Sequence, residues 1–250
     1  MENQQRLDTL RKAAPVSDLA LETTRTAARK RLFTGQEEHK MSLEDASRLT
    51  HNYRMRAGKD AVKGAYVGRA ILETILDQQR CVGIRVYFAK HLDGRPTFVL
   101  SGVESSGNDL FEGPLGEEVW LCPPWCSPVN RLNSDVTVEP TAEERKPIFT
   151  GMENHFVTLA EASRLTRNYR DTAPPGSAKG GYFGGNIFRK ILAQPRSVGL
   201  RIYFAEHDNG TPTLVLVGVD REGSDLVYGE IGQEIWLCPP WCAKPNPLNN

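Results

Sequence analysis

The chain lacks a surplus of charge of either sign. Lys plus Arg number 31 and Asp plus Glu number 31, which gives a formal net charge of zero at pH 7. Proteins that bind nucleic acid normally carry a basic excess or a basic stripe, and electrostatic binding to a membrane surface needs clustered basic residues. The balance therefore argues against nucleic acid and against a membrane as partners.

Long apolar runs are missing as well. Residues 1–33 contain no run that resembles the apolar core of a secretory signal. No stretch elsewhere approaches the roughly 20 apolar residues that a membrane-spanning helix needs. We therefore expect a cytoplasmic protein, in which cysteines are normally reduced or bound to metal.

Cysteine is scarce, and its spacing departs from the common motifs. Of the five cysteines, Cys81 stands alone and the others form two copies of Cys-Pro-Pro-Trp-Cys, in which the spacing is Cys-x3-Cys rather than the Cys-x2-Cys of redox sites and zinc knuckles. Three interpretations stay open: structural residues with reduced thiols, which we favour, a joint four-cysteine zinc site, and reversible disulfides. In the favoured interpretation each pair stays within its own copy of the motif. The residues concerned are Cys122, Cys126, Cys238 and Cys242.

What the chain does have is an internal repeat. The segment Cys81–Val103 returns as Ser197–Val219, displaced by 116 positions. The displacement holds without a gap between residues 29–126 and residues 145–242, and roughly half of the aligned positions are identical. The sequence therefore predicts two homologous units with these bounds. The remaining parts are an N-terminal helical arm at 1–28, a linker at 127–144 and a tail at 243–250.

Each unit begins with two predicted helices. Ser42 and Thr158 each precede an acidic residue by three positions, which is a capping-box pattern at a helix start. A second helix is predicted over residues 64–76 and 180–192. Its second copy carries four glycines in its first turns, and glycine costs up to about 1 kcal/mol per site in a helix interior. Either another segment approaches that backbone closely or the helix starts later there.

A β-hairpin follows the helices in each unit. Residues 82–89 alternate between aliphatic or aromatic residues and others with the period of a strand, and Asp93-Gly94 and Asn209-Gly210 supply turn residues. A short third strand is predicted at 119–121 and 235–237. The predicted fold is therefore α+β, with two homologous units related by a pseudo-two-fold axis, each with two helices packed on a small, mainly antiparallel sheet.

The first hairpin strand supplies the candidate binding or interface residues. Arg85, Tyr87 and His91 are expected on one face, where Arg and His could bind an anion and His could act as an acid or base near neutral pH. The interpretation that we favour is a polar face, or one that the other unit covers with Tyr in the contact. The second copy of this trio is Arg201, Tyr203 and His207. Four further residues recur without partners that the sequence can assign: His39, His155, Asp109 and Asp225.

The order of motifs in the unit resembles short bacterial proteins of unknown function. The motifs concerned are a capped helix that ends Asn-Tyr-Arg, a Gly-Tyr-Phe-Gly segment, Val-Gly-Leu-Arg-Ile-Tyr-Phe, Val-Leu-Val-Gly-Val-Asp and a final Cys-Pro-Pro-Trp-Cys. Those proteins look like single copies of the unit, so the resemblance covers nearly all of residues 29–242. It implies a tandem duplication, and it implies no activity, cofactor or catalytic residue.

These features together predict a non-enzymatic, self-associating structural or scaffold protein without a cofactor. Its expected partner is itself, in a homo-oligomer or a larger assembly, and exposed hairpin edges would offer a route to association. The alternative is a small-ligand or metal-binding module, conceivably an enzyme. That module would use the Arg-Tyr-His face or the paired cysteines, with zinc as its cofactor.

Overall fold

The computed structural model describes residues 32–58, 60–117, 119–135, 147–233 and 235–250. The predicted arm at 1–28 and residues 136–144 of the predicted linker lie outside the described residues. Below, half 1 denotes residues 32–135 and half 2 denotes residues 147–250. A residue of half 1 and the residue 116 positions later are called equivalent.

The described residues form an α+β fold with four helices, as predicted for the fold class. The helices are α3 (Leu43–Ala57), α4 (Arg69–Leu76), α5 (Leu159–Thr172) and α6 (Gly185–Leu192). The strands of half 1 are β1 (Gly64–Gly68), β2 (Cys81–Lys90), β3 (Pro96–Glu104), β4 (Leu115–Gly116) and β5 (Trp120–Cys122). Those of half 2 are β6 (Phe156–Val157), β7 (Gly180–Gly184), β8 (Gly199–Glu206), β9 (Pro212–Val219), β10 (Ile231–Gly232) and β11 (Trp236–Cys238). No helix among the described residues has the length and apolar character needed to cross a bilayer.

The predicted starts of α3 and α5 are confirmed. The side chain of Ser42 accepts a hydrogen bond from the backbone N–H of Asp45, and Thr158 accepts one from Glu161 in the same way. Each bond satisfies one of the N–H groups that the first turn of a helix leaves without a backbone partner. The hydroxyl residues therefore fix where these two helices begin.

The prediction of a helix over residues 64–76 and 180–192 is wrong for the first five residues of each segment. These residues form β1 and β7, and α4 and α6 start only where the strands end. A Cβ atom at Gly180 would lie 2.2 Å from the carbonyl oxygen of Val86. The glycines therefore serve a close approach of two strands, and the expectation of such an approach and of a later helix start is confirmed for the second copy.

Two antiparallel sheets each combine strands from both halves. The strand order is β10-β9-β8-β1-β5 in sheet A and β11-β7-β2-β3-β4-β6 in sheet B. In sheet A, β1 of half 1 pairs with β8 of half 2, and Gly64 lies opposite Tyr203. In sheet B, β7 of half 2 pairs with β2 of half 1, and Gly180 lies opposite Tyr87. Half 1 thus contributes β1 and β5 to sheet A, and half 2 contributes β6, β7 and β11 to sheet B. The exchanged strands β1 and β7 have equivalent registers.

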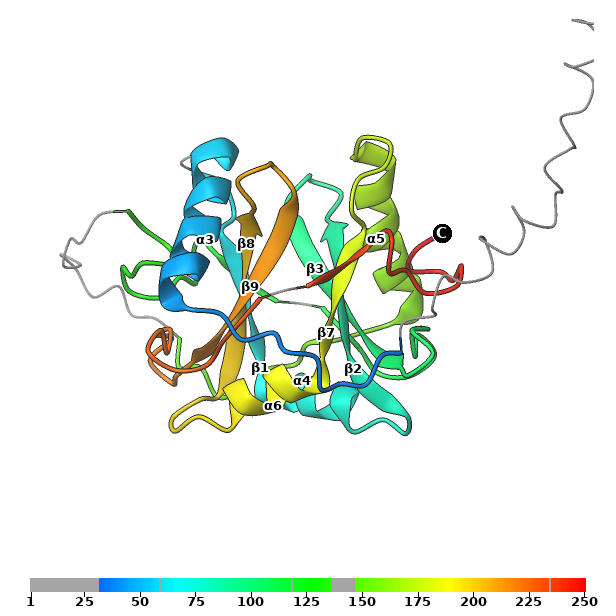
Figure 1. Cartoon of the computed structure of the whole chain (residues 1–250), viewed down its shortest axis with the longest axis horizontal. Helices are drawn as coiled ribbons and strands as arrows, with labels where there is room; N and C mark the ends of the chain where they lie inside the picture. The colour runs from blue at the N-terminus through cyan, green and yellow to red at the C-terminus, as the bar shows by residue number, and fades with distance from the viewer. Residues whose placement is uncertain (1–31, 59, 118, 136–146, 234) are drawn as a thin grey trace, which may run out of the picture. The chain divides into compact units, whose positions relative to one another are not determined.

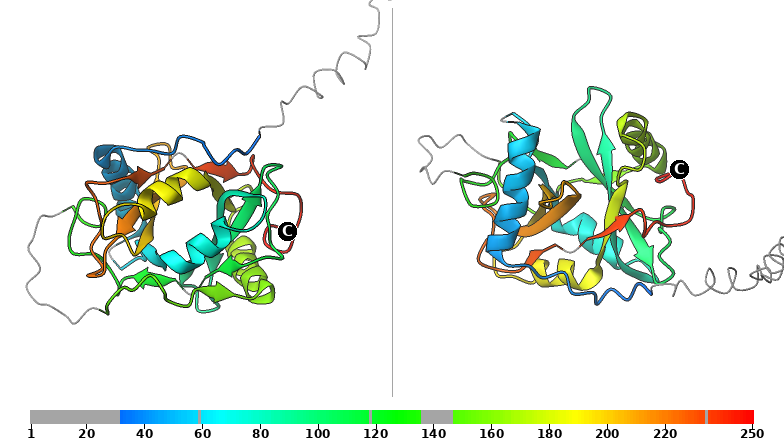
Figure 2. Two further views of the ribbon diagram at one scale, coloured as in Figure 1. Left: turned by 90° about the horizontal axis from the view of Figure 1, so that it is seen from below. Right: turned by 45° about the horizontal axis from the view of Figure 1, so that its top comes forward.

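The two sheets face each other, with α3 and α5 on their outer sides and α4 and α6 across one end (Figure 1). The largest hydrophobic cluster joins the inner faces of both sheets to α4 and α6, with Ile71, Val86 and Ile202 among its fully buried members. The outer face of sheet A is covered by α3 through Leu49, and the outer face of sheet B by α5 through Leu165. The left view of Figure 2 shows α4 and α6 next to each other at one end of the sheets. The core is therefore continuous across both halves.

The hairpins are interior parts of the sheets. Each of β2, β3, β8 and β9 has a neighbouring strand on both sides, so the expected exposed hairpin edges are absent from the described structure. The sheet edges consist of β5, β6, β10 and β11, which have two or three residues each. Very short edge strands are one of the ways in which proteins prevent strand-to-strand association.

Candidate functional site

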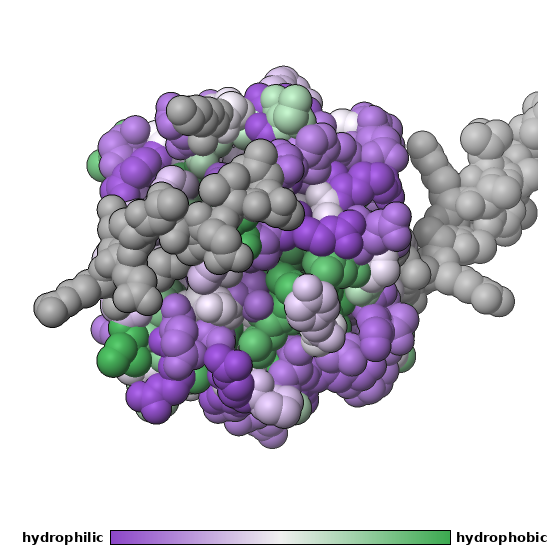
Figure 3. All heavy atoms as spheres, turned by 90° about the vertical axis from the view of Figure 1, so that its left-hand side faces the viewer, coloured by the Kyte–Doolittle hydropathy of each residue, from purple (hydrophilic) through white to green (hydrophobic). Residues whose placement is uncertain are grey.

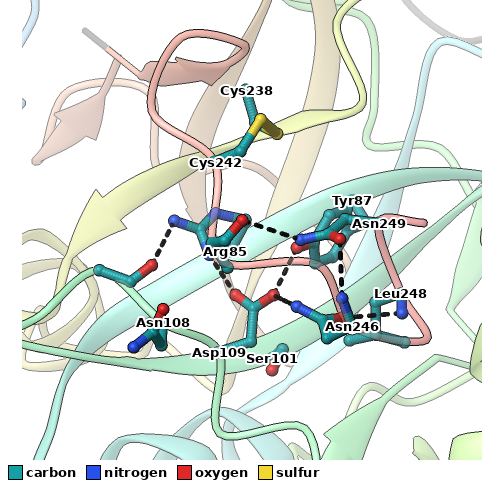
Figure 4. Close-up of polar contacts among 12 residues, drawn as sticks. Arg85, Tyr87, Ser101, Asn108, Asp109, Cys238, Cys242, Asn246, Leu248 and Asn249 are labelled. Atoms are coloured by element: carbon teal, nitrogen blue, oxygen red, sulfur yellow. Dashed lines mark hydrogen bonds and ion pairs between the residues drawn. A yellow bond between two sulfur atoms is a disulfide. The ribbon is translucent and has the colours of Figure 1, made fainter.

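The candidate residues Arg85 and Tyr87 lie fully buried on the outer face of sheet B (Figure 4). Both contact Asp109, which follows β3: the Arg85 guanidinium donates to one carboxylate oxygen, and the Tyr87 hydroxyl donates to the other. The side chains of Arg85 and Asp109 have 0% exposure. Burying two charges is costly unless their geometry and additional hydrogen bonds offset the loss of water. The trio meets this condition by bonding internally.

The equivalent trio in half 2 repeats this arrangement. Arg201 and Tyr203 both donate to the carboxylate of Asp225. The sequence pointed to the arginines and tyrosines, whereas the two aspartates were left without partners. Their signal was recurrence, 24 residues after the arginine in each half. No local pattern shows that this loop folds back onto the first hairpin strand.

A segment of half 2 completes the buried network of half 1. Residues 243–249, predicted to be a tail, lie against sheet B, and we call them strap 2. The side-chain amide of Asn246 donates to Asp109 at 2.8 Å, and Leu248 is fully buried. Arg170 of α5 donates to the carbonyl of Leu248 at 2.6 Å. The expected tail is thus part of the folded core.

The equivalent segment of half 1 completes the network of half 2. Residues 127–133 belong to the predicted linker, and we call them strap 1. Asn130 donates to Asp225 at 2.9 Å, and Leu132 is fully buried. Arg54 of α3 donates to the carbonyl of Leu132 at 2.7 Å. Both straps therefore cross from one half to the other.

Burial controls the protonation of the tyrosines in these networks. It raises the pKa of Tyr87, and the neighbouring carboxylate of Asp109 raises it further. The pKa of Tyr203 is raised well above its ordinary value for the same reasons, with Asp225 as the carboxylate. Both phenols therefore stay protonated at neutral pH and serve as fixed hydrogen-bond donors.

The structure separates His91 from Arg85 and Tyr87. His91 follows the end of β2, is partly exposed, and its Nε2 lies 3.6 Å from a carboxylate oxygen of the buried Glu117. The equivalent His207 lies 3.5 Å from the side-chain nitrogen of Gln233. The predicted Arg-Tyr-His trio is therefore two features, a buried Arg–Tyr–Asp network and a histidine at the hairpin turn.

The paired cysteines form two disulfides, Cys122–Cys126 and Cys238–Cys242. Each bond stays within its own motif, as predicted, but the favoured expectation of reduced thiols is wrong. A tight turn brings each pair together, as in half 1, where the N–H of Trp125 donates to the carbonyl of Leu121 at 2.9 Å. A metal binds the thiolate form of cysteine, so a zinc site at these residues would require prior reduction.

The recurring histidines serve structural contacts between the halves. In half 1 the Nε2 of His39 accepts a hydrogen bond from the N–H of Gly184 at 2.9 Å, and Nδ1 lies 3.0 Å from the carbonyl oxygen of Gln233. A ring nitrogen that accepts a hydrogen bond belongs to a neutral imidazole. The equivalent His155 is also fully buried. Neither ring faces an open ligand site.

Two depressions open at equivalent places on the surface. One, of about 440 Å³, includes Arg80 and Asp109 in its lining, and the other, of about 590 Å³, includes Arg196 and Asp225. Arg80 and Arg196 both have φ +71°, a left-handed conformation that is uncommon outside glycine. Arg196 is ion-paired with Asp220 at 2.7 Å. Arg80 is likewise ion-paired with Glu104 at 3.2 Å, so both arginines already have an acidic partner.

No family model, curated protein or solved structure matches the chain. Its function is therefore argued from the geometry alone. Within the described part of the chain, no group of three or more His, Cys, Asp or Glu side chains is placed to hold a metal ion. The best-defined polar arrangement is the pair of buried networks, which join the two halves.

Proposed function

We propose that the chain is a non-enzymatic structural protein in which two copies of one unit form an internal dimer about a pseudo-two-fold axis. The observation that supports this proposal is the reciprocal exchange of β1 and β7. The exchanged strands pair with equivalent registers, and the two straps cross in opposite directions onto equivalent carboxylates. An arrangement in which the main cross-contacts recur in equivalent pairs is typical of an isologous dimer.

The contacts of the buried arginine also support a structural role. Arg85 donates to Asp109, to the carbonyl of Gly107 at 3.2 Å and to the carbonyl of Trp241 at 3.2 Å. Its guanidinium is fully buried, so a soluble anion would have to displace protein groups to reach it. An arginine committed in this way holds segments together, which matches its planar, multi-donor chemistry.

Further association between copies of the chain is part of the proposal. Several large apolar side chains are mostly exposed: Met55, Leu92, Ile148, Met152 and Tyr228. On the face shown in Figure 3, hydrophilic residues predominate and apolar ones gather in a central area. Such areas commonly mark interaction surfaces. We propose that these exposed apolar side chains take part in a homo-oligomer, together with the N-terminal arm.

Light scattering and metal analysis on one sample test the proposal. A metal-free assembly of two or more chains supports it, whereas a monomer with stoichiometric zinc supports the alternative. Deletion of residues 1–28 should lower the mass of the assembly, and an unchanged mass would show that the arm does not contribute. The arm lies outside the described residues, so this experiment is its direct test.

The second candidate function is a small-ligand or zinc-binding module. The recurrence of the two depressions at equivalent positions favours ligand binding. Zinc binding by the cysteines would need reduced protein, so the zinc analysis should be repeated after reduction in the absence of oxygen. Zinc that appears only in the reduced sample, with the fold retained, would favour this candidate.

The cellular compartment is a separate question. The cytoplasm remains our prediction from the sequence, but disulfides persist mainly in oxidising compartments. Alkylation of thiols in intact cells before lysis distinguishes the reducing cytoplasm from an oxidising compartment. Modified Cys126 and Cys242 would indicate a reducing compartment, and unmodified, disulfide-bonded residues would indicate an oxidising one.

A further inference from the structure

The two disulfides differ in their exposure to solvent. Cys122 and Cys238 are both fully buried, so attack from solvent must occur at the second cysteine of each pair. Cys242 is exposed, whereas Cys126 is only half-exposed. Because thiol–disulfide exchange needs access to one sulfur along the S–S bond, Cys238–Cys242 is the more accessible bond.

Each disulfide turn also holds a carbonyl against a buried arginine of the other half. The carbonyl of Trp241, between Cys238 and Cys242, accepts a hydrogen bond from Arg85 at 3.2 Å. The same turn leads directly into strap 2, whose Asn246 donates to Asp109 (Figure 4). The disulfide therefore fixes the start of the strap at the point where the strap enters the buried network.

Strap 1 has an anchor that strap 2 lacks. The hydroxyl of Ser127 accepts a hydrogen bond from the N–H of Asp225 at 2.9 Å and another from the side chain of Asn130 at 3.0 Å. The equivalent position in strap 2 is Ala243, which has no side-chain hydrogen-bonding group. Strap 2 has a different anchor, in which the N–H of Lys244 donates to the side chain of Asn108 at 3.3 Å. Because this is one longer bond against the two that Ser127 accepts, loss of the neighbouring disulfide should loosen strap 2 more than strap 1.

We propose that Cys238–Cys242 is a thiol–disulfide exchange site whose reduction by a dithiol releases strap 2 from the buried network of half 1, while Cys122–Cys126 stays oxidised. A thiolate of the dithiol attacks the Sγ of Cys242, forms a mixed disulfide and expels the Cys238 thiolate. The second thiol of the reductant then attacks its own sulfur in the mixed disulfide and expels the Cys242 thiolate. The dithiol becomes a cyclic disulfide, and two electrons and two protons pass to the protein.

Release of the strap follows from the loss of its fixed starting point. Once the turn opens, the carbonyl of Trp241 is no longer held at Arg85, and Asn246 loses the geometry that places it at Asp109. Water then replaces the Trp241 carbonyl and the Asn246 amide as hydrogen-bonding partners of the Arg85–Asp109 ion pair. Reduction of one solvent-facing bond is thereby linked to the contact between the halves.

A titration of the whole protein with dithiothreitol tests the proposal. Samples are quenched with an alkylating reagent, and peptide mass spectrometry follows each cysteine, with Cys81 as an internal thiol reference. We expect Cys238 and Cys242 to become alkylated at least tenfold faster than Cys122 and Cys126. Equal rates, or earlier reduction of Cys122–Cys126, would overturn the order of reduction.

Hydrogen exchange at the same dithiothreitol concentration tests the release. The amides of strap 2 should exchange at least tenfold faster after reduction of Cys238–Cys242, with strap 1 unchanged. The matched variants are C238S/C242S, which should give the fast exchange without reductant, and C122S/C126S, in which strap 2 should still respond to reductant. Unchanged protection of strap 2 in the reduced wild type would refute the coupling. The wild-type time course decides this even if a double variant does not fold.

Discussion

Several contacts that cross between the halves recur in both directions, whereas exposed positions vary. The side chains of Asn52 and Asn168 both donate to a backbone carbonyl of the other half, at Glu206 (3.1 Å) and at Lys90 (3.0 Å). At the surface, by contrast, Tyr228 takes the position equivalent to Glu112. The comparison shows that the cross-contacts constrain the sequence more strongly than the outer surface does.

Some cross-contacts change as pairs. Arg56 of α3 forms an ion pair with Glu206 of β8. Their equivalents are Thr172 and Lys90, and the ammonium of Lys90 donates to the hydroxyl of Thr172 at 2.8 Å. The basic residue has moved from the helix to the strand and no acidic residue remains, but a polar contact joins the helix to the sheet in both places. Residues that touch across the halves therefore behave as coupled units.

The largest expected effect comes from separating the halves. Residues 32–135 expressed alone would leave β1 and β2 without β8 and β7, their partners in the other half. We expect this fragment to be unfolded as a monomer or to form a homodimer in which two copies exchange β1. Light scattering and circular dichroism check this outcome. The equivalent fragment 147–250 is the matched control, and a stable folded monomer from either fragment would contradict the internal dimer.

The next largest effect is expected from Arg85→Ala and Arg201→Ala. Each change leaves a buried carboxylate uncompensated, which typically costs about 3–5 kcal/mol. Urea unfolding should show this loss in both variants, because the two networks are equivalent. Arg95→Thr is the control, since Arg95 is mostly exposed and Thr211 occupies the equivalent position; it should stay within about 0.5 kcal/mol. A folded arginine variant that had lost affinity for a small anion would instead indicate a ligand site.

Local signals predicted the elements that depend on neighbouring residues. Patterns within one segment predicted three kinds of element: the capped starts of the helices at Ser42 and Thr158, the hairpins, and the short strands before the cysteines. The strands β1 and β7 were missed because apolar residues such as Tyr66 and Val67 suit a strand and a helix equally. Their partners in the other half lie 131–139 positions away for β1 and 93–101 positions away for β7, and no local pattern encodes this pairing.

The candidate site was predicted only in part. Alternation on β2 correctly placed Arg85 and Tyr87 on one face, opposite the aliphatic residues. The straps were missed because the predicted units end at the second cysteine of each motif, which assigned the residues beyond to a linker and a tail. Asn130 and Asn246 lie beyond that point at equivalent positions, and this recurrence could have identified the straps. The contact with the carboxylate itself depends on the exchanged arrangement, which only the structure shows.

A third prediction concerns alkaline pH. Burial raises the pKa of Tyr66, Tyr87, Tyr182 and Tyr203 in the folded state, whereas phenols of the unfolded chain ionise near pH 10. Above that pH the unfolded state binds fewer protons, so the free energy of unfolding falls as pH rises. Each tyrosine contributes about 1.4 kcal/mol per pH unit to the slope.

Single variants can measure how much each tyrosine contributes to the slope of the unfolding free energy with pH. Tyr87→Phe and Tyr203→Phe should each reduce it by about 1.4 kcal/mol per pH unit, measured by urea unfolding between about pH 10.5 and pH 11.5. Equal reductions would show that the two networks are equally buried in solution. A slope that neither variant changes would mean that these phenols ionise normally in the folded protein.

The smallest expected effect tests an asymmetry between the two straps. Ser127→Ala removes the hydroxyl that accepts hydrogen bonds from Asp225 and Asn130, and it makes strap 1 match strap 2 at this position. A buried hydrogen bond contributes about 1 kcal/mol, so the urea midpoint should fall accordingly while the slope with denaturant stays constant. Ala243→Ser is the reciprocal variant, and it should gain stability only if the N–H of Asp109 is placed as that of Asp225 is. If Ser127→Ala leaves the midpoint unchanged, the hydroxyl of Ser127 does not anchor strap 1, and the anchoring argument for the earlier release of strap 2 fails.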